Sequence, residues 1–414
     1  MPGGRTVELD RAILEAVRGR LDGLPSLLAA LVREQSLLGN ETPAQDIVTG
    51  RLAAAGFAVE RIEPDAEAAL ADPHAGYPPL PYRGRSSVVG LRAGSGGGSS
   101  LHLSGHIDVV PVDPDAPWEH DPWGGELARG RIWGRGAGDM KGGLAAYLLA
   151  AEAVVEVCGD APGDLAFSSV IEEECGGNGF WAVLRAGYRA DATLIGEPTG
   201  LAVVRAGTGV VWARLRARGQ AGHSAYSGGD GPFDELARAV AALRRLEASR
   251  NEPPLEAVFE AVSAWPYGMT VGRIGGGVWT ASAPASLEAS IRFGIGLGVE
   301  PAGIQREIVE AVAGAAPAVE VAFEAFRAPA YCHDTTGPFP TLLQRTHADV
   351  LGSPPGIAAF TATTDARQVD GALCYGPLAG SLHGGDEWVD LASLEQTATV
   401  VALTAARWIA SENP

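Results

Sequence analysis

The spacing of apolar residues predicts helices alternating with short strands along the first half of the chain. Between residues 9 and 55, apolar positions recur at helical spacing, interrupted at Gly39-Asn40 and closed by Gly56, so this stretch predicts two helices. Short apolar or β-branched runs bounded by Gly, Pro and Asp predict strands at residues 86–90, 101–103, 165–170 and 193–195. A helical pattern at 142–157 lies between two of them. This alternation indicates an α/β sheet that binds ligands at its strand ends.

The pattern changes after about Gly207 and changes back after about Arg327. In between, an alternating strand, a helix, a second strand and a second helix follow one another at residues 210–216, 233–248, 286–294 and 303–313. This β-α-β-α unit is large enough to stand as a small domain. We therefore predict a catalytic domain made of residues 1–206 and 327–414, with a smaller domain of residues 207–326 inserted between the two parts.

Length and charge limit the partners and the location of the protein. A chain of 414 residues favours two domains, and its formal net charge of −19 argues against nucleic acid or an anionic membrane as a partner, because either would repel it. No apolar run of about 20 residues occurs, and residues 1–20 carry Asp and Glu where a signal peptide needs apolar residues. We expect a cytoplasmic protein that acts on a small molecule.

Cysteine and lysine are both sparse. The four cysteines are widely spaced and form no CxxC pair, so we expect reduced thiols. Of the 31 basic residues, only Lys141 is a lysine. A compact ammonium beside a crowded site is one reason to keep a lysine there, and chance placement is the other.

Two fragments place polar residues where a strand ends or turns. His106 ends an apolar strand in SGHIDVVP, and Asp108 points to the same face because strand side chains alternate. A carboxylate beside an imidazole is typical of a metal-binding histidine, although most strand-end histidines are structural. In GRGAGDMKGG, glycines flank Asp139 at a strand-to-helix turn, where an aspartate more commonly caps the helix. Neither fragment alone identifies a site.

Three acidic or histidine-containing fragments complete the set. In IEEECGGNG, Glu172, Glu173 and Glu174 follow an apolar strand, and adjacent carboxylates repel one another there unless a cation or protons offset their charge. Two more fragments supply Glu197 in IGEPT, and His383 and Glu387 in LHGGDEW. Two histidines and several carboxylates at one sheet edge predict a metal site. Nitrogen and oxygen ligands without thiolate suit zinc, with manganese or cobalt as substitutes.

These five fragments, in this order and over nearly the whole chain, resemble the M20 metallopeptidase family, which includes acetylornithine deacetylase, succinyl-diaminopimelate desuccinylase, aminoacylase and glutamate carboxypeptidase. The resemblance implies an amide hydrolase, most simply an N-acyl-amino-acid deacylase, in which a hydroxide bound by two zinc ions attacks the amide. It also implies an α/β fold. A zinc-peptidase-type catalytic domain, with a mixed sheet flanked by helices, would carry an inserted α+β, ferredoxin-like lid through which two copies form a homodimer.

The resemblance assigns metal-binding roles to five residues. It implies that His106 and Glu197 bind one zinc ion, that Glu174 and His383 bind the other, and that Asp139 bridges both. Relatives often have a cis peptide after the bridging aspartate, so we expect one at Asp139-Met140.

It also assigns roles beside the metals. Glu173 would be the general base, and Asp108 would orient His106. His223 in GHSAYS matches the histidine that stabilises the oxyanion from the inserted domain, often that of the other subunit. Arg292 in SIRFG and Arg367 in TTDARQ resemble positions that hold a substrate carboxylate. A surface turn for the histidine and ordinary ion pairs for the arginines are the alternatives.

The chain departs from the family pattern in three places. Glu172 stands where relatives commonly have Asp. The segment SGGDGPFDEL after His223 lacks the usual Gly-x-Asn-Ala, and GGGVWTASAP has Thr280 and Ser282 around where many relatives place Asn. These differences weaken any transfer of substrate identity.

Other functions stay open at this point. A dipeptidase or carboxypeptidase would use the same metals, a deformylase or another deacylase of a small amine would fit as well, and a catalytically silent metal-binding relative would keep the fold. A cysteine hydrolase based on Cys175 is disfavoured, because the neighbouring Glu174 raises the pKa of that thiol. The acyl group, the amine, the physiological metal and the oligomeric state are not encoded in a recognisable way.

Overall fold

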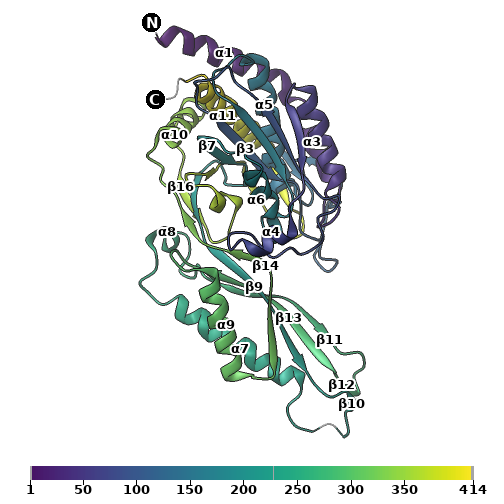
Figure 1. Cartoon of the computed structure of the whole chain (residues 1–414). Helices are drawn as coiled ribbons and strands as arrows, with labels where there is room; N and C mark the ends of the chain where they lie inside the picture. Colours follow the sequence, from purple (N-terminus) through teal and green to yellow (C-terminus); the bar gives the residue numbers. More distant parts are fainter. Residues whose placement is uncertain (1, 227, 412–414) are drawn as a thin grey trace.

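The computed structural model describes residues 2–226 and 228–411, which form a larger main unit and a smaller four-stranded unit (Figure 1). Both ends of the described chain lie in the main unit. The four-stranded unit runs from β9 (Gly209–Arg218) to β14 (Val319–Ala328), and these two strands lead out of the main unit. The exact domain boundaries, at 206/207 and 326/327, stay a prediction. None of the described helices is both long and apolar enough to cross a membrane.

A mixed nine-stranded sheet forms the centre of the main unit. Its strands run in the order β1-β2-β6-β3-β7-β17-β8-β15, with β16 pairing to β8. Their bounds are β1 (Ala58–Ile62), β2 (Ser87–Arg92), β6 (Leu165–Val170), β3 (Leu101–His106), β7 (Ala192–Ile195), β17 (Leu373–Cys374), β8 (Val203–Gly207), β15 (Tyr331–Cys332) and β16 (Ile357–Phe360). The four predicted strands are confirmed, and β6, β3 and β7 are parallel neighbours. Their carboxyl ends therefore meet at one edge of the sheet.

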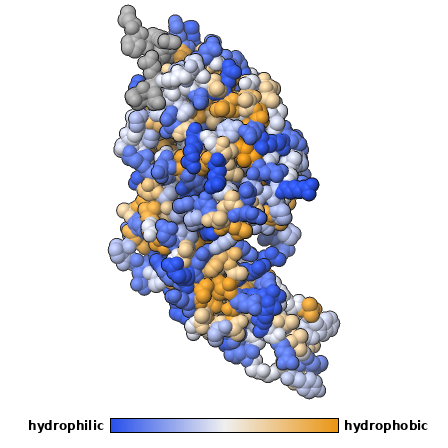
Figure 2. Space-filling view, viewed as in Figure 1, coloured by the Kyte–Doolittle hydropathy of each residue, from blue (hydrophilic) through white to orange (hydrophobic). Residues whose placement is uncertain are grey.

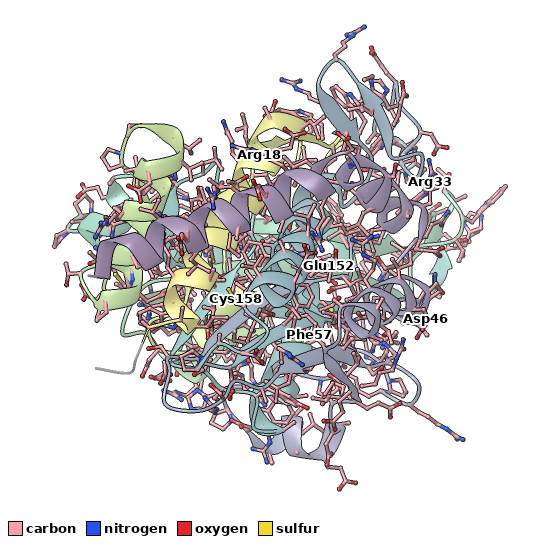
Figure 3. The ribbon with its side chains drawn as sticks, turned by 90° about the horizontal axis from the view of Figure 1, so that it is seen from above. Arg18, Arg33, Asp46, Phe57, Glu152 and Cys158 are labelled. Atoms are coloured by element: carbon pink, nitrogen blue, oxygen red, sulfur yellow. The ribbon has the colours of Figure 1, made fainter. Side chains whose placement is uncertain are left out.

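Helices cover both faces of this sheet. One apolar cluster packs α1 (Pro2–Leu21), α2 (Leu24–Arg33), α3 (Thr42–Ala54), α5 (Gly142–Val157), α10 (Pro338–Leu351) and α11 (Leu391–Ile409) on one side. A second cluster, with α4 (Ala66–Ala71) and α6 (Asn178–Arg185), packs on the other. Seen from above, α1 lies across the main unit (Figure 3). Glu152 of α5 pairs with Arg51 of α3 at 2.6 Å. The prediction for 142–157 is confirmed.

The prediction of two helices before Gly56 is wrong, because three occur. The apolar spacing continues across Gly23, but the first helix ends at Leu21 and a second begins at Leu24. Gly23 forms the cap, and the proline that follows sits in the first turn of α2, where its missing N–H costs no hydrogen bond. The local glycine and proline therefore divide into two helices a stretch that its apolar spacing predicted to be one.

The four-stranded unit has the element order β-α-β-β-α-β. It contains β9, α7 (Pro232–Arg250), β11 (Met269–Gly276), β13 (Ser286–Ile295), α9 (Pro301–Ala315) and β14, and the antiparallel sheet runs β11-β13-β9-β14. This is the ferredoxin-like arrangement. The predicted strands and helices are present, but β11 and β14 were missed. The unit has an apolar cluster of its own between sheet and helices, and a short pair, β10 (Gly222–His223) with β12 (Ser282–Ala283), ends it at the lower tip of Figure 1.

A small antiparallel sheet joins two distant parts of the main unit. Its strands are β18 (Ala379–Gly380), β19 (Trp388–Asp390), β5 (Arg131–Trp133) and β4 (Glu126–Ala128), in that order. Because β19 pairs with β5, the glycine-rich turn after Trp133 lies against the loop between β18 and β19. That contact brings the fragment with Asp139 to the fragment with His383.

Candidate metal centre and active-site cavity

Three neighbouring strands deliver acidic and imidazole side chains to one place. His106 is the last residue of β3, Glu173 and Glu174 lie in the short 3-10 turn (Glu173–Cys175) that follows β6, and Glu197 lies just after β7. The three strands are parallel and adjacent, so these side chains share the carboxyl edge of the sheet. This is the edge at which the sequence predicted ligand binding.

Asp139 enters the same place from the turn before α5. The turn, Ala137–Lys141, has non-helical dihedral angles at Asp139 and Met140, and the peptide between them is cis, as expected. The backbone N–H groups of Gly138 and Asp139 both donate to one carboxylate oxygen of Glu387 at 3.0 Å. The other oxygen of Glu387 accepts a hydrogen bond from buried Arg135. Sequence reasoning did not single out Arg135, because a buried ion pair over 252 residues leaves no local pattern.

The carboxylate of Asp139 lies between the two predicted histidine ligands. One oxygen is 3.1 Å from His106 Nε2 and the other is 3.4 Å from His383 Nε2. His383 Nε2 is also 3.2 Å from Glu174. Ligand atoms of His106, Asp139 and Glu174 all lie within 4.8 Å of one another. This donor set of imidazole nitrogens and carboxylate oxygens fits metal ions, with Asp139 in position to serve two of them.

The charge of the cluster supports the same interpretation. Glu173 and Glu197 are buried beside Asp139 and Glu174, and burial together with the neighbouring negative charges raises the pKa of both Glu173 and Glu197. Four carboxylates this close together need cations or protons to offset their repulsion. Bound metal ions would supply that positive charge.

Asp108 contacts His106 differently from the prediction. The Nδ1 atom of His106 lies 2.9 Å from the backbone carbonyl of Asp108 and 3.8 Å from its carboxylate. The carboxylate instead accepts hydrogen bonds from the backbone N–H groups of Glu173 and Glu174, at 3.1 and 3.2 Å. Asp108 therefore orients the imidazole through its carbonyl and holds the turn that carries the two glutamates through its side chain.

Glu172 and Lys141 lie behind the cluster and support it. Glu172 is fully buried with φ of +65°, and it accepts hydrogen bonds from Tyr82 at 2.7 Å and Asn178 at 3.1 Å. Lys141 donates to the carbonyls of Leu31 and Glu34 at 2.8 Å each, and burial lowers its pKa to about 7. The single lysine thus ties the end of α2 to the turn of Asp139.

A cavity of about 300 Å³ opens beside the cluster, between the main unit and the four-stranded unit. Its acidic floor consists of Asp139, Glu173, Glu174 and Glu197, together with His383. Its walls are Pro198, Val210, Trp212, Arg292, Phe326, Phe360, Ala362, Thr363, Thr364 and Leu382. One oxygen of Glu173 and the hydroxyl of Thr363 have no hydrogen-bond partner among the described residues. Both are positioned to bind a substrate or water.

The two predicted substrate arginines differ. Arg292 lines the cavity and is held by hydrogen bonds to the carbonyls of Gly268 and Thr361, each at 3.1 Å. Arg367 is not among the lining residues. It is buried, donates to the carbonyls of Thr364 and Gly176 at 2.9 Å, and lies 3.5 Å from Asp365. These contacts join the loop after Glu174 to the loop before Asp365. Arg292 therefore faces the cavity and Arg367 does not, and substrate contact stays a prediction.

His223 lies far from the cluster of its own chain. It is exposed on β10, at the lower tip of Figure 1, and it is not one of the residues that line the cavity. Ser227, the last residue of the GHSAYS fragment, lies outside the described residues.

Cys175 does not offer a nucleophile. The thiol is buried, and burial together with the nearby Glu172 and Asp108 raises its pKa well above the ordinary value. A thiolate would be strongly disfavoured there. The described geometry therefore gives no support to a cysteine hydrolase.

Comparison with known proteins agrees with this geometry. Residues 102–407 match the family described as Peptidase family M20/M25/M40. The chain is 30% identical to succinyl-diaminopimelate desuccinylase of Methylorubrum populi, over 94% of this chain and 100% of the relative, and 31% identical to that of Methylobacterium radiotolerans, over 92% and 95%. The structure of the di-peptidase Dug1p from Saccharomyces cerevisiae superposes with a TM-score of 0.81 at 13% identity, covering 98% and 99% of the two chains.

Proposed function

Because the chain belongs to peptidase family M20/M25/M40 and is therefore a hydrolase of amide bonds, we propose that it removes the acyl group from an N-acyl amino acid. The observation that carries the proposal is the position of Asp139 between His106 and His383, with Glu173 beside them in a cavity large enough for a small molecule. The relatives named as desuccinylases favour deacylation over peptide hydrolysis.

Two zinc ions are the cofactors that the donor set fits best. His106 and Glu197 would hold one, Glu174 and His383 the other, and Asp139 would contact both. When bound, the ions lower the pKa of water and polarise an amide carbonyl, and cobalt or manganese would supply the same chemistry.

Glu173 is the proton carrier in this proposal. It is buried, it lines the cavity, and one of its oxygens has no partner among the described residues. That oxygen accepts a proton from the attacking water and returns it to the leaving nitrogen. Asp108 keeps Glu173 in place by accepting the hydrogen bond from its backbone N–H. Arg292 binds the substrate carboxylate at the far wall of the cavity.

The donor for the oxyanion comes from a second copy of the chain. His223 is exposed at the tip of the four-stranded unit, away from the cluster of its own chain, so a dimer through that unit would deliver it to the partner's cavity. Support comes from the large apolar side chains on the same tip. Tyr226, Val278 and Trp279 are 90%, 96% and 73% exposed. Figure 2 shows hydrophobic residues among the hydrophilic surface of this unit. Such patches are typical of interfaces.

A dipeptidase is the second candidate. Its support is the fold shared with the di-peptidase Dug1p, and the same floor residues would perform the same proton transfers. A silent relative is disfavoured because every residue assigned to the metals and to the proton transfer is present. Cytoplasmic location and the domain boundaries at 206/207 and 326/327 belong to the proposal as well.

The test measures metal content and hydrolysis together. The purified protein is assayed for zinc and then for release of amine from N-acetyl, N-succinyl and N-formyl amino acids and from dipeptides, before and after treatment with a chelator. About two metal ions per chain and chelator-sensitive deacylation are expected. Hydrolysis of dipeptides alone would select the second candidate. Absence of metal after reconstitution would overturn the ligand assignment.

A further inference from the structure

The walls of the cavity are apolar and largely aromatic. Trp212 and Phe326 come from neighbouring strands of the four-stranded unit, and their rings meet edge to face with centroids 5.3 Å apart. Phe360 and Leu382 line the cavity from the main unit. None of these side chains has a part in the proton transfers. A ring pair at the wall of a substrate cavity offers a large apolar surface to whatever binds there.

Among the described residues that line the cavity, Arg292 alone has a lysine or arginine side chain. Arg292 is partly buried, and its guanidinium forms no ion pair with a carboxylate of the described residues. The carbonyls of Gly268 and Thr361 orient it without neutralising its charge. A partly buried guanidinium without a carboxylate partner is suited to bind one carboxylate from a ligand.

Arg292 and Trp212 occupy neighbouring positions on two paired strands. Arg292 of β13 is paired directly opposite Trp212 of β9, and directly opposed residues of an antiparallel pair point to the same face. One ligand can therefore place a carboxylate on Arg292 and an adjacent apolar group on Trp212. Directly opposed residues have Cβ atoms about 4.5–5.5 Å apart, close enough for the α-carboxylate and the side chain of one amino acid to reach both.

The number of cationic side chains in the cavity does not match the number of carboxylates in succinyl-diaminopimelate, the compound in the names of the relatives. That compound carries three carboxylates and one ammonium. Within one chain, one arginine would leave two carboxylates beside aromatic rings and an acidic floor, and the histidine proposed to come from the partner is already assigned to the oxyanion. Burial of unpaired charge is costly. Loss of a complementary group at a polar site also reduces turnover strongly.

We propose that the substrate is an N-acyl derivative of an amino acid with one carboxylate and an aromatic or large aliphatic side chain. The carboxylate binds Arg292, and the side chain packs on Trp212 and Phe326. This inference rests on the proposed function and adds the substrate class to it.

The first test compares substrates on the zinc-loaded, full-length protein. N-acetyl-L-phenylalanine should have a kcat/KM about 100-fold or more above that of N-acetyl-L-aspartate and of N-succinyl-diaminopimelate, because only the first fits one cation and an apolar wall. Faster turnover of N-succinyl-diaminopimelate would overturn the inference and leave the proposed function intact. No hydrolysis of any substrate would count against the proposed function itself.

A binding experiment tests the substrate class separately from the proposed hydrolytic function. In the Glu173→Gln variant, calorimetry should detect N-acetyl-L-phenylalanine binding, and Trp212→Ala in the same background should weaken it about 10-fold or more, whereas Trp212→Phe should keep most of the affinity. Trp265→Ala removes an indole from the same unit outside the cavity and serves as the control. Equal affinity in Trp212→Ala and Trp265→Ala would contradict the assignment of the wall, whatever the turnover.

Discussion

The floor and the wall of the cavity are built in different ways. Every floor residue lies at the end of a strand or in a glycine-rich turn. Its position follows from local chain geometry, from three adjacent parallel strands and from the pairing of β19 with β5. The wall combines residues of β9, β13 and β14 with residues near β16, and its shape depends on how two units pack. The comparison suggests that the floor determines the chemistry and the wall determines the substrate.

The substitution Glu173→Gln should have the largest effect, and it tests whether the floor determines the chemistry. We expect kcat to fall by about 10³–10⁴-fold, because a positioned proton carrier is removed, while the metal content is unchanged. Glu310→Gln, on the exposed side of α9, is the matched control. Undiminished turnover in Glu173→Gln would remove Glu173 from the mechanism.

The tip of the four-stranded unit tests whether the floor is complete in one chain. His223→Ala should lower kcat by about 10²–10³-fold, as expected for loss of an oxyanion donor. If the partner supplies this histidine, mixing His223→Ala with Glu173→Gln chains should restore activity, because one cavity of each mixed dimer has both residues. Restoration would be measured after subunit exchange.

Mixing that restores nothing, with a monomer in sedimentation, would contradict the dimer. A variant carrying Val278→Asp and Trp279→Asp should in turn shift the protein to monomers and lose activity to a similar extent as His223→Ala. An unchanged sedimentation coefficient would mean that the apolar tip is not the interface.

The two arginines test which residues bind the substrate and which only stabilise the surrounding loops. Arg292→Leu should raise KM by about 10–100-fold with little change in thermal stability, because one charged contact to the substrate is lost. Arg367→Leu should leave KM nearly unchanged but lower the free energy of unfolding by about 3–5 kcal/mol, since it breaks a buried pair with Asp365. The reverse result would exchange their roles. Steady-state kinetics and thermal unfolding distinguish them.

The smallest expected effect on turnover is at Glu387. Glu387→Gln removes the charge that pairs with Arg135 while keeping an oxygen for the backbone N–H groups before Asp139. Metal affinity should fall about 10-fold or more, with turnover at saturating zinc nearly unchanged. Equilibrium dialysis against a zinc chelator measures this. A large loss of kcat at saturating zinc would mean that Glu387 takes part in the reaction itself.

The sequence predicted the floor well because strand ends and glycine turns are local features. Glu174, Glu197, the helix after Asp139 and the neighbouring His106 could all be placed from short fragments, whereas the cis peptide was expected from the family resemblance. The contacts of Arg135 and Arg367 were beyond reach, since each joins segments about 190 residues or more apart.

Apart from Arg292, the residues of the wall were missed for a related reason. β11 is glycine-rich, and β14 has an irregular register between Phe323 and Arg327, so neither follows strict alternation. Phe326 lies inside that irregular stretch and lines the cavity. A sequence pattern identifies an apolar residue there but does not indicate which side of the strand it occupies.

The separate origin of floor and wall has a consequence for the evolution of this fold. Substitutions on β9 or β14 can change which molecule is accepted without disturbing any residue that performs the reaction. Proteins descended from one ancestor could in that way acquire new substrates while inheriting the same catalytic residues. Trp212 and Phe326 are the positions at which such divergence would be recorded first.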